Sequence, residues 1–245
     1  MFRTGFRFLQ GSRAYHSVQH PSRIISSKGV DAVVLKQALT HIPKYGFDSL
    51  CITQAIRELE YPDSLVLALT SSPSGESLEF QLVKYWLQAQ RQKLNDSVVE
   101  PSNEFHQISN EYERTKFLLK QRLWYNEPVA HHLGGALAQL VTPYNVQASI
   151  GELHALADDI AFFAGDESND FAWYTKRFGI STIYVGAELL MMQDSSPSFK
   201  ATYNFVDGKV DELRNLGAGY NNVEQWTLFN AVSLVNLIKS QLTRG

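Results

Sequence analysis

The chain has 245 residues, of which 44% are hydrophobic, and a formal net charge of −3 at pH 7. This length and apolar share suffice for a sizeable core, which excludes a chain that is disordered throughout. The single cysteine, Cys51, excludes an internal disulfide and a cysteine-based zinc site, so the sequence carries no sign of an oxidising compartment.

The first thirty residues form a basic leader that contains five serines and lacks acidic residues. Such a composition is typical of a mitochondrial presequence, whereas the apolar stretches are too short for a secretory signal. Nowhere does the sequence contain a run of about 20 apolar residues that would suit a membrane span. We therefore expect residues 1–29 to be a presequence. Its basic residues are Arg3, Arg7, Arg13, Arg23 and Lys28.

The remainder predicts one helix after another, because apolar residues recur at helical spacing between turns rich in proline, glycine and serine. The predicted helices cover residues 34–45, 51–59, 76–94, 108–125, 129–141, 145–163, 171–193, 199–216 and 223–242. Strict alternation of apolar and polar residues is scarce. We predict an all-α fold of about nine helices, with one domain over residues 30–222 and a C-terminal amphipathic helix in residues 223–245.

Patterns that would indicate catalysis are missing from the sequence. A di-iron bundle needs Glu-x-x-His pairs, and no glutamate here has a histidine three residues later. His131 and His132 are adjacent, so on a helix they would point about 100° apart and could not easily share a metal. Phosphate-binding glycine loops and the nucleophile elbow are also absent. We expect no metal, no cofactor and no reaction of its own.

Short leading helices raise the possibility of a helix-turn-helix DNA binder. The segment that would have to contact DNA, Leu50–Leu69, has Arg57 as its only basic residue against Glu58, Glu60 and Asp63. Recognition helices offer cations to phosphate oxygens. The geometry of such a motif could be kept, but we expect no nucleic acid as a partner.

Three blocks of sequence, in order, carry a resemblance to a known family. They are ADDIAFFAG at residues 157–165, DFAWYTKR at 170–177 and ELLMMQDSSPSF at 188–199. Together they resemble the coenzyme Q (ubiquinone) biosynthesis lipid-binding accessory family, over about residues 30–245. The tail VNLIKSQLTRG, residues 235–245, is similar to fungal members.

This resemblance implies a TetR-like helical fold that does not regulate genes. It further implies a dimeric protein of the mitochondrial matrix, peripheral to the inner membrane, which binds isoprenoid quinone intermediates or other lipids. The partner that the resemblance implies is the di-iron hydroxylase that acts on demethoxyubiquinone, within the wider coenzyme Q synthesis complex. Three features of the sequence agree with these implications: the scarcity of basic residues in Leu50–Leu69, the missing Glu-x-x-His pairs and the leader without acidic residues.

A lipid site is expected along residues 178–192, which are apolar on nearly every face of a helix. Two glycines seven residues apart lie on roughly one face, and each costs about 1 kcal/mol against alanine inside a helix. They suggest either close approach of a neighbouring helix or room for a ligand, and the resemblance favours the ligand. The predicted lipid-binding residues are Phe178, Gly179, Ile183, Gly186, Leu190, Met191 and Met192.

The last predicted helix is apolar over most of its circumference and follows a glycine-rich linker. The resemblance implies that it associates with a membrane, and its terminal cations suit anionic headgroups. We expect it to lie in the membrane interface and to gate the lipid site. The predicted membrane residues are Trp226, Phe229, Leu234, Leu237, Ile238, Lys239, Leu242 and Arg244.

The block at 170–177 places two large aromatic residues, Trp173 and Tyr174, beside two cations. Neighbouring residues on a helix diverge by about 100°, so these two cannot both face the core. Exposed aromatic residues beside cations are typical of interface hot spots. The resemblance assigns this block to the surface that meets the hydroxylase, and we expect Ile160, Trp173, Tyr174 and Arg177 to bind that partner.

Other functions stay open at this point. A TetR-like transcriptional regulator would show sequence-specific binding to duplex DNA. A helical enzyme would carry a tightly bound metal or cofactor. A membrane-docked scaffold without a specific lipid pocket would carry no bound lipid after purification.

Overall fold

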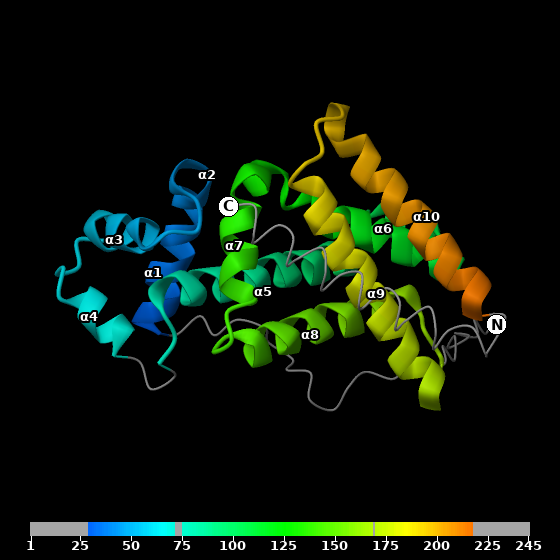
Figure 1. The fold of residues 1–245 in the computed structure, drawn as a ribbon, viewed down its shortest axis with the longest axis horizontal. Helices are drawn as coiled ribbons and strands as arrows, with labels where there is room; N and C mark the ends of the chain where they lie inside the picture. The colour runs from blue at the N-terminus through cyan, green and yellow to red at the C-terminus, as the bar shows by residue number, and fades with distance from the viewer. Residues whose placement is uncertain (1–28, 72–74, 169, 218–245) are drawn as a thin grey trace, which may run out of the picture.

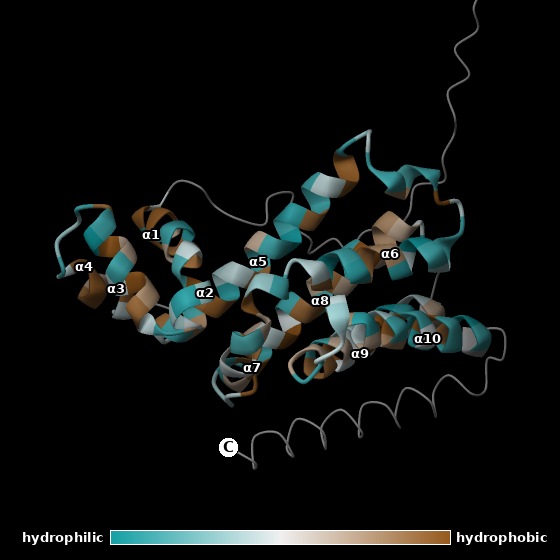
Figure 2. Cartoon of the chain, turned by 90° about the horizontal axis from the view of Figure 1, so that it is seen from above, coloured by the Kyte–Doolittle hydropathy of each residue, from teal (hydrophilic) through white to brown (hydrophobic). Residues whose placement is uncertain are grey.

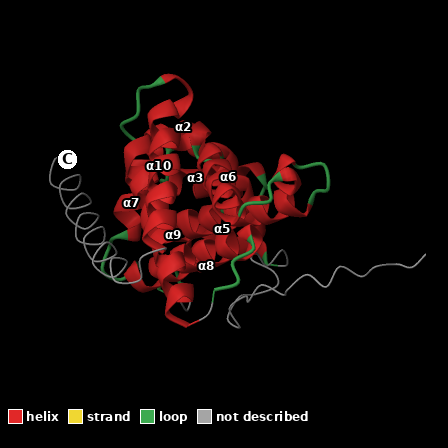
Figure 3. Cartoon of the chain, turned by 90° about the vertical axis from the view of Figure 1, so that its right-hand side faces the viewer, coloured by secondary structure: helices red, strands yellow, loops and turns green. Residues whose placement is uncertain are grey.

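The computed structural model describes residues 29–71, 75–168 and 170–217. Over these ranges the chain forms helices and loops and no strand (Figure 3). The predicted all-α fold is therefore confirmed. The leader and the predicted helix over residues 223–242 lie outside the described residues, and the TetR-like topology stays a prediction.

Ten α-helices and four short 3-10 helices follow one another in these three ranges. The N-terminal helices are α1 (Val30–Ala38), η1 (Leu39–His41), α2 (Ile42–Tyr45), α3 (Ser49–Glu58) and α4 (Leu65–Thr70). The central helices are α5 (Leu78–Val99), η2 (Glu104–Gln107), α6 (Glu111–Trp124), η3 (Glu127–His132) and α7 (Leu133–Leu140). The remaining helices are α8 (Val146–Ala164), α9 (Asp170–Met191), η4 (Pro197–Phe199) and α10 (Lys200–Gly217).

Each predicted helix that falls within the described residues is present, with differences in detail: the one predicted over residues 129–141, for example, divides into η3 and α7. The predicted helix over residues 34–45 divides into α1, η1 and α2, and Pro43 lies in the first turn of α2, where its missing N–H costs no helical hydrogen bond. The short helix α4 was not predicted, because six residues are too few to show a helical period.

Local side chains fix where several helices begin and end. Asp48, Ser77 and Asn110 each accept a hydrogen bond from a backbone N–H in the first turn of α3, α5 and α6. Such caps satisfy donors that have no partner inside the helix. At the other end, α8 stops at Gly165, whose φ of 90° is accessible to glycine at little cost.

The turn between α9 and α10 is held by Asp194. Its carboxylate accepts hydrogen bonds from the backbone N–H of Ser196 at 2.8 Å and of Thr202 at 2.9 Å. Burial alone would raise the pKa of Asp194, but hydrogen bonds from the side chains of Ser196 and Thr202, together with those from their backbone N–H groups, outweigh it and lower the pKa to about 2. The carboxylate therefore stays charged at neutral pH and fixes the start of α10.

The helices form a small N-terminal group joined to a larger bundle, with α5 reaching from one to the other (Figure 1). On the N-terminal side, α1 packs against α3 and α5. On the other side, α5 packs against α7 and α8, while α9 packs against both α8 and α10. Figure 2 shows that the helices carry both hydrophobic and hydrophilic segments, as expected for helices with one buried face.

The bundle brings α5, α6, α7, α8 and α9 around a common space, although α5 and α9 are far apart in sequence. Most of their buried apolar residues belong to one continuous core cluster. This packing creates the cavity described next.

Candidate functional site

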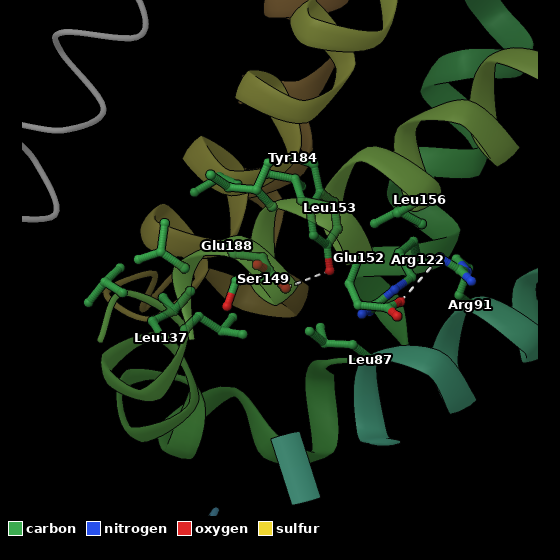
Figure 4. Close-up of a pocket in the computed structure, with 15 residues that line it drawn as sticks. Leu87, Arg91, Arg122, Leu137, Ser149, Glu152, Leu153, Leu156, Tyr184 and Glu188 are labelled. Carbon is green, nitrogen blue, oxygen red and sulfur yellow. Dashed lines mark hydrogen bonds and ion pairs between the residues drawn. The ribbon is translucent and has the colours of Figure 1, made fainter. Parts of the chain in front are cut away.

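A cavity of about 230 Å³ lies between α5, α6, α7, α8 and α9 (Figure 4). Its lining is mostly aliphatic, with a few charged and hydroxyl groups among the apolar side chains. An apolar cavity of about 150 Å³ is large enough for benzene, so this one has room for a substituted ring or a short stretch of hydrocarbon chain. The lining residues are Leu87, Arg91, Arg122, Leu137, Leu140, Val141, Val146, Ser149, Ile150, Glu152, Leu153, Leu156, Tyr184, Val185 and Glu188.

The cavity opens beside the first two turns of α8. Val146 and Ile150 line it and are also exposed, Ile150 to 60% of its surface. Tyr144, just before α8, is 95% exposed. An apolar chain that leaves the cavity would therefore pass exposed apolar side chains on its way out.

The deep wall of the cavity is polar and is built from α6, its C-terminal turn and α9. Arg122 is fully buried and donates from Nη1 to Oδ1 of Asn126 at 2.5 Å. Asn126 in turn donates to Oε1 of Glu188 at 2.8 Å, and the hydroxyl of Tyr184 donates to the same oxygen at 2.5 Å. Figure 4 shows Tyr184 and Glu188 joined in this way at the cavity.

Burial has the largest effect on the pKa values of Glu188 and Tyr184 in this wall. It raises the pKa of the Glu188 carboxyl, although the charge of Arg122 and the hydrogen bonds from Tyr184 and Asn126 act in the opposite direction. Burial also raises the pKa of Tyr184 well above its ordinary value, so the hydroxyl stays protonated and can donate to Glu188.

A second ionic group lies on the α5 and α8 side of the cavity. Arg91 Nη1 lies 3.2 Å from Oε2 of Glu152, and Arg91 Nε lies 3.4 Å from Oδ2 of the buried Asp159. Gln88 also donates to Glu152, at 2.7 Å. In Figure 4, Arg91, Glu152 and Arg122 lie together on one side of the cavity. Arg91 thus has two carboxylates, whereas Arg122 has the amide of Asn126.

None of the seven predicted lipid-binding residues lines this cavity. Gly179, Ile183, Gly186 and Leu190 share one face of α9, and the cavity borders the opposite face, through Tyr184, Val185 and Glu188. Phe178 is exposed, Met191 is buried in the core, and the methyl group of Met192 lies against Gly134 of α7. The helix that we expected to line a site does so, through different residues.

The two glycines of α9 allow close approach of α10. A Cβ atom on Gly179 would lie 2.8 Å from Cδ1 of Leu213, and one on Gly186 would lie 3.2 Å from Cζ of Phe205. The first distance is shorter than Cβ contacts in real structures. Close approach, one of the two interpretations of these glycines, is therefore what the packing supports.

The four predicted partner-binding residues lie in different surroundings. Tyr174 is 66% exposed, and Trp173 is partly exposed and packs against Tyr174 with ring centroids 4.8 Å apart. Ile160 and Arg177 are buried, so they offer no surface to a partner in this conformation. Arg177 pairs with Asp158 at 2.6 Å and with Asp166 at 2.8 Å.

The remaining predictions concern a membrane site and the absence of metal and DNA sites. All eight predicted membrane residues lie outside the described residues. In residues 29–71, 75–168 and 170–217 no helix has the length and apolar character needed to cross a bilayer. The same residues hold no cluster of three or more potential metal ligands. Arg57, the lone base of the segment that would meet DNA, lies 3.8 Å from Asp63.

The polar wall of the cavity is not among the sites predicted from the sequence. Glu188 stands as a lone acid within the apolar run of residues 178–192, and Arg122 lies on a helix whose neighbours at 118, 119 and 123 are leucines. A charged residue at an apolar position is a signal of a buried polar site. That signal marks each residue separately and does not show that the two meet.

Comparison with known proteins gives the family. A family model described as COQ9 matches residues 146–217. The ubiquinone biosynthesis protein COQ9, mitochondrial, of Saccharomyces cerevisiae is 33% identical over 99% of this chain and 97% of that protein. Its Schizosaccharomyces pombe counterpart is 35% identical, over 94% of this chain and 88% of that protein.

The chain belongs to the COQ9 family. The human ubiquinone biosynthesis protein COQ9, mitochondrial, is 31% identical over 83% of this chain and 66% of that protein. The resemblance found in the sequence is thus confirmed, and this COQ9-family chain has a role in ubiquinone biosynthesis. The matched residues span α8, α9 and α10, which include the cavity mouth, Glu188 and the exposed Tyr174.

Proposed function

We propose that this protein is a non-catalytic, lipid-binding accessory protein of ubiquinone biosynthesis. It holds an isoprenoid quinone intermediate in the cavity between α5 and α9 and presents it to the di-iron hydroxylase that acts on demethoxyubiquinone. It works in the mitochondrial matrix, as a homodimer at the surface of the inner membrane and within the wider coenzyme Q synthesis complex.

The observation that carries this proposal is the cavity itself. Its aliphatic walls suit a hydrocarbon chain, and its polar groups are concentrated in the deep wall and on the α5 side. Sites for small molecules generally combine apolar walls with a few polar groups that fix the orientation of the ligand. With about 230 Å³, the cavity is too small for a long isoprenoid chain, so part of the chain would leave past Val146 and Ile150.

The exposed aromatic residues support the presenting role. Tyr174 and Trp173 lie at the start of α9, the same helix that lines the cavity with Tyr184, Val185 and Glu188. A partner that binds at the start of α9 would therefore contact the element that holds the ligand. Of the four predicted partner-binding residues, these two are the ones that can touch another protein directly.

The test is to fill the cavity. Ser149 lines the cavity and donates to the carbonyl of Asn145 at 2.9 Å, and Ser149→Phe would place a ring in the space. We expect the variant to retain about tenfold less isoprenoid quinone intermediate, because overpacking of this kind costs about 1–3 kcal/mol. Mass spectrometry of the lipids that co-purify with the full chain measures this.

Ser149→Ala is the matched control, because it removes the same hydrogen bond and leaves the cavity open. It should retain lipid as the wild type does. If the wild type carries no isoprenoid lipid, or if Ser149→Phe retains as much as the wild type while remaining folded, the cavity is not the lipid site. The protein would then be better described as a scaffold without a specific pocket.

A further inference from the structure

Arg122 has hydrogen-bonding capacity that its surroundings leave unused. Its side chain has 0% exposure and lines the cavity. Nη1 donates to Asn126, but within the described part of the chain Nε and Nη2 have no hydrogen-bond partner. An arginine is always charged in proteins, and buried donors without partners are costly and rare.

The two unused nitrogens belong to one edge of the guanidinium group. The N–H bonds of Nε and Nη2 run side by side, so this edge can donate to two oxygens that lie next to each other. Arg122 therefore offers a fork for a pair of neighbouring acceptors.

Two aromatic rings lie near the same guanidinium group. The guanidinium carbon lies 5.2 Å from the centroid of the Trp86 ring and 5.3 Å from that of the Tyr184 ring. Cation–π contacts of this kind hold a guanidinium plane in place. The edge formed by Nε and Nη2, which has no hydrogen-bond partner among the described residues, is the part of Arg122 that can bind a ligand in the cavity.

The charges around the cavity favour an uncharged ligand head. Glu188 and Glu152 line the cavity with Arg122 and Arg91, and Asp159 lies behind Arg91. An anionic head would add a negative charge beside these carboxyl groups. A neutral head with oxygen acceptors would satisfy the donors of Arg122 without that repulsion.

We propose that Arg122 recognises two neighbouring oxygens on the ring of an uncharged quinone or quinol, whose isoprenoid chain runs along the apolar walls toward Val146 and Ile150. The inference rests on the proposed function, because it assumes that the cavity holds an isoprenoid quinone. It adds which end of the ligand enters first and which residue distinguishes the ring from a plain hydrocarbon chain.

The first experiment uses the wild-type full chain and three probes with the same short isoprenoid tail. One probe has a benzoquinone ring with adjacent carbonyl and methoxy oxygens, one lacks the methoxy oxygens, and one is the hydrocarbon tail alone. We expect the first to bind about tenfold or more tightly than the other two, because hydrogen bonds to a charged donor are strong. Equal affinity for all three would overturn the role of Arg122.

The second experiment replaces Arg122 by methionine, which keeps the length of the side chain, and by lysine, which keeps the charge and loses the fork. Both Arg122→Met and Arg122→Lys should lose the preference for adjacent oxygens and still bind the hydrocarbon tail, which also shows that they are folded. A variant that binds the tail and keeps the full preference would overturn the inference.

Two further outcomes separate this inference from the proposed function. If the wild type binds none of the probes, the proposed lipid cavity fails, and the inference fails with it. If the wild type binds the tail but binds a fatty acid of similar length more tightly than it binds the quinone, the cavity is still a lipid site. The proposal that its ligand has an uncharged ring would then be wrong.

Discussion

Two buried arginines of this protein have opposite surroundings. Arg177 is compensated by two carboxylates, Asp158 and Asp166, whereas the hydrogen bond of Arg122 goes to a neutral amide. Arg177 also lies 3.9 Å from the ring centroid of Trp173 and donates to its backbone carbonyl at 3.3 Å. We therefore assign to Arg177 a positioning role, in which it ties α9 to α8 and orients Trp173 for the partner that we propose.

Tyr174 is the residue at which the partner surface can be tested most directly. We expect Tyr174→Ala to weaken binding of the hydroxylase by about 2 kcal/mol, because exposed aromatic residues of this kind are typical hot spots. Stability should change by less than about 0.5 kcal/mol, since the side chain is 66% exposed. Calorimetric titration of the full chain with the purified hydroxylase measures the affinity.

Tyr144→Ala is the control for this experiment, because Tyr144 is also strongly exposed but lies before the start of α8, away from the start of α9 in the sequence. It should leave the affinity for the hydroxylase unchanged. Equal losses in the two variants, or no loss in Tyr174→Ala, would remove the start of α9 from the interface.

At the scale of elements, different parts of the surface of α9 have different roles. One face carries Gly179 and Gly186 and meets α10, the opposite face carries Tyr184 and Glu188 and borders the cavity, and the first turns carry the exposed Tyr174. In Figure 1, α9 runs between α8 and α10, in agreement with their contacts. A helix used on all sides has little room for polar residues, which explains its long apolar run.

Because α9 and α10 lie in close contact, we expect the size of the side chain at position 179 to affect stability strongly. We expect Gly179→Leu to lower the free energy of unfolding by about 1–3 kcal/mol, because a side chain there would collide with Leu213. Chemical denaturation followed by circular dichroism measures this change.

Gly208, in the middle of α10, is the contrasting position, because a Cβ atom there would meet nothing within 4 Å. Gly208→Ala should raise the free energy of unfolding by about 0.5–1 kcal/mol through helix propensity alone. If Gly179→Leu is as stable as the wild type, α9 and α10 can move apart. The two glycines would then make room for a ligand instead of for close packing.

At the scale of the whole molecule, the cavity mouth and the partner surface belong to different helices. The mouth lies at the start of α8, beside Val146 and Ile150, and the exposed aromatic residues lie at the start of α9. Because α8 packs along α9, a lipid could enter from a membrane at one helix while the partner binds at the other. This arrangement suits a protein that stands between a bilayer and an enzyme.

Membrane binding is the prediction that belongs to this scale. We expect removal of residues 222–245 to weaken binding to liposomes with anionic headgroups by about tenfold or more, because Lys239 and Arg244 would each contribute about 1 kcal/mol at such a surface. Co-sedimentation of the full and shortened chains with the liposomes measures the loss. Equal binding of the two chains would show that other residues dock the protein.

The sequence by itself determined the all-α class, the approximate positions of most helices and the family. Helical periodicity acts within a few residues, so it can be read along the chain. It also marked residues 178–192 as a helix that must be covered on nearly every side.

Only the tertiary structure decided which side of that helix faces which neighbour. The period of α9 shows that Gly186 and Glu188 lie on different faces, but not that α10 covers one and a cavity borders the other. The polar wall likewise joins Arg122 and Asn126 to Glu188, about 60 positions further along the chain. Contacts at such separations depend on how whole helices pack, and no local pattern of residues encodes that packing.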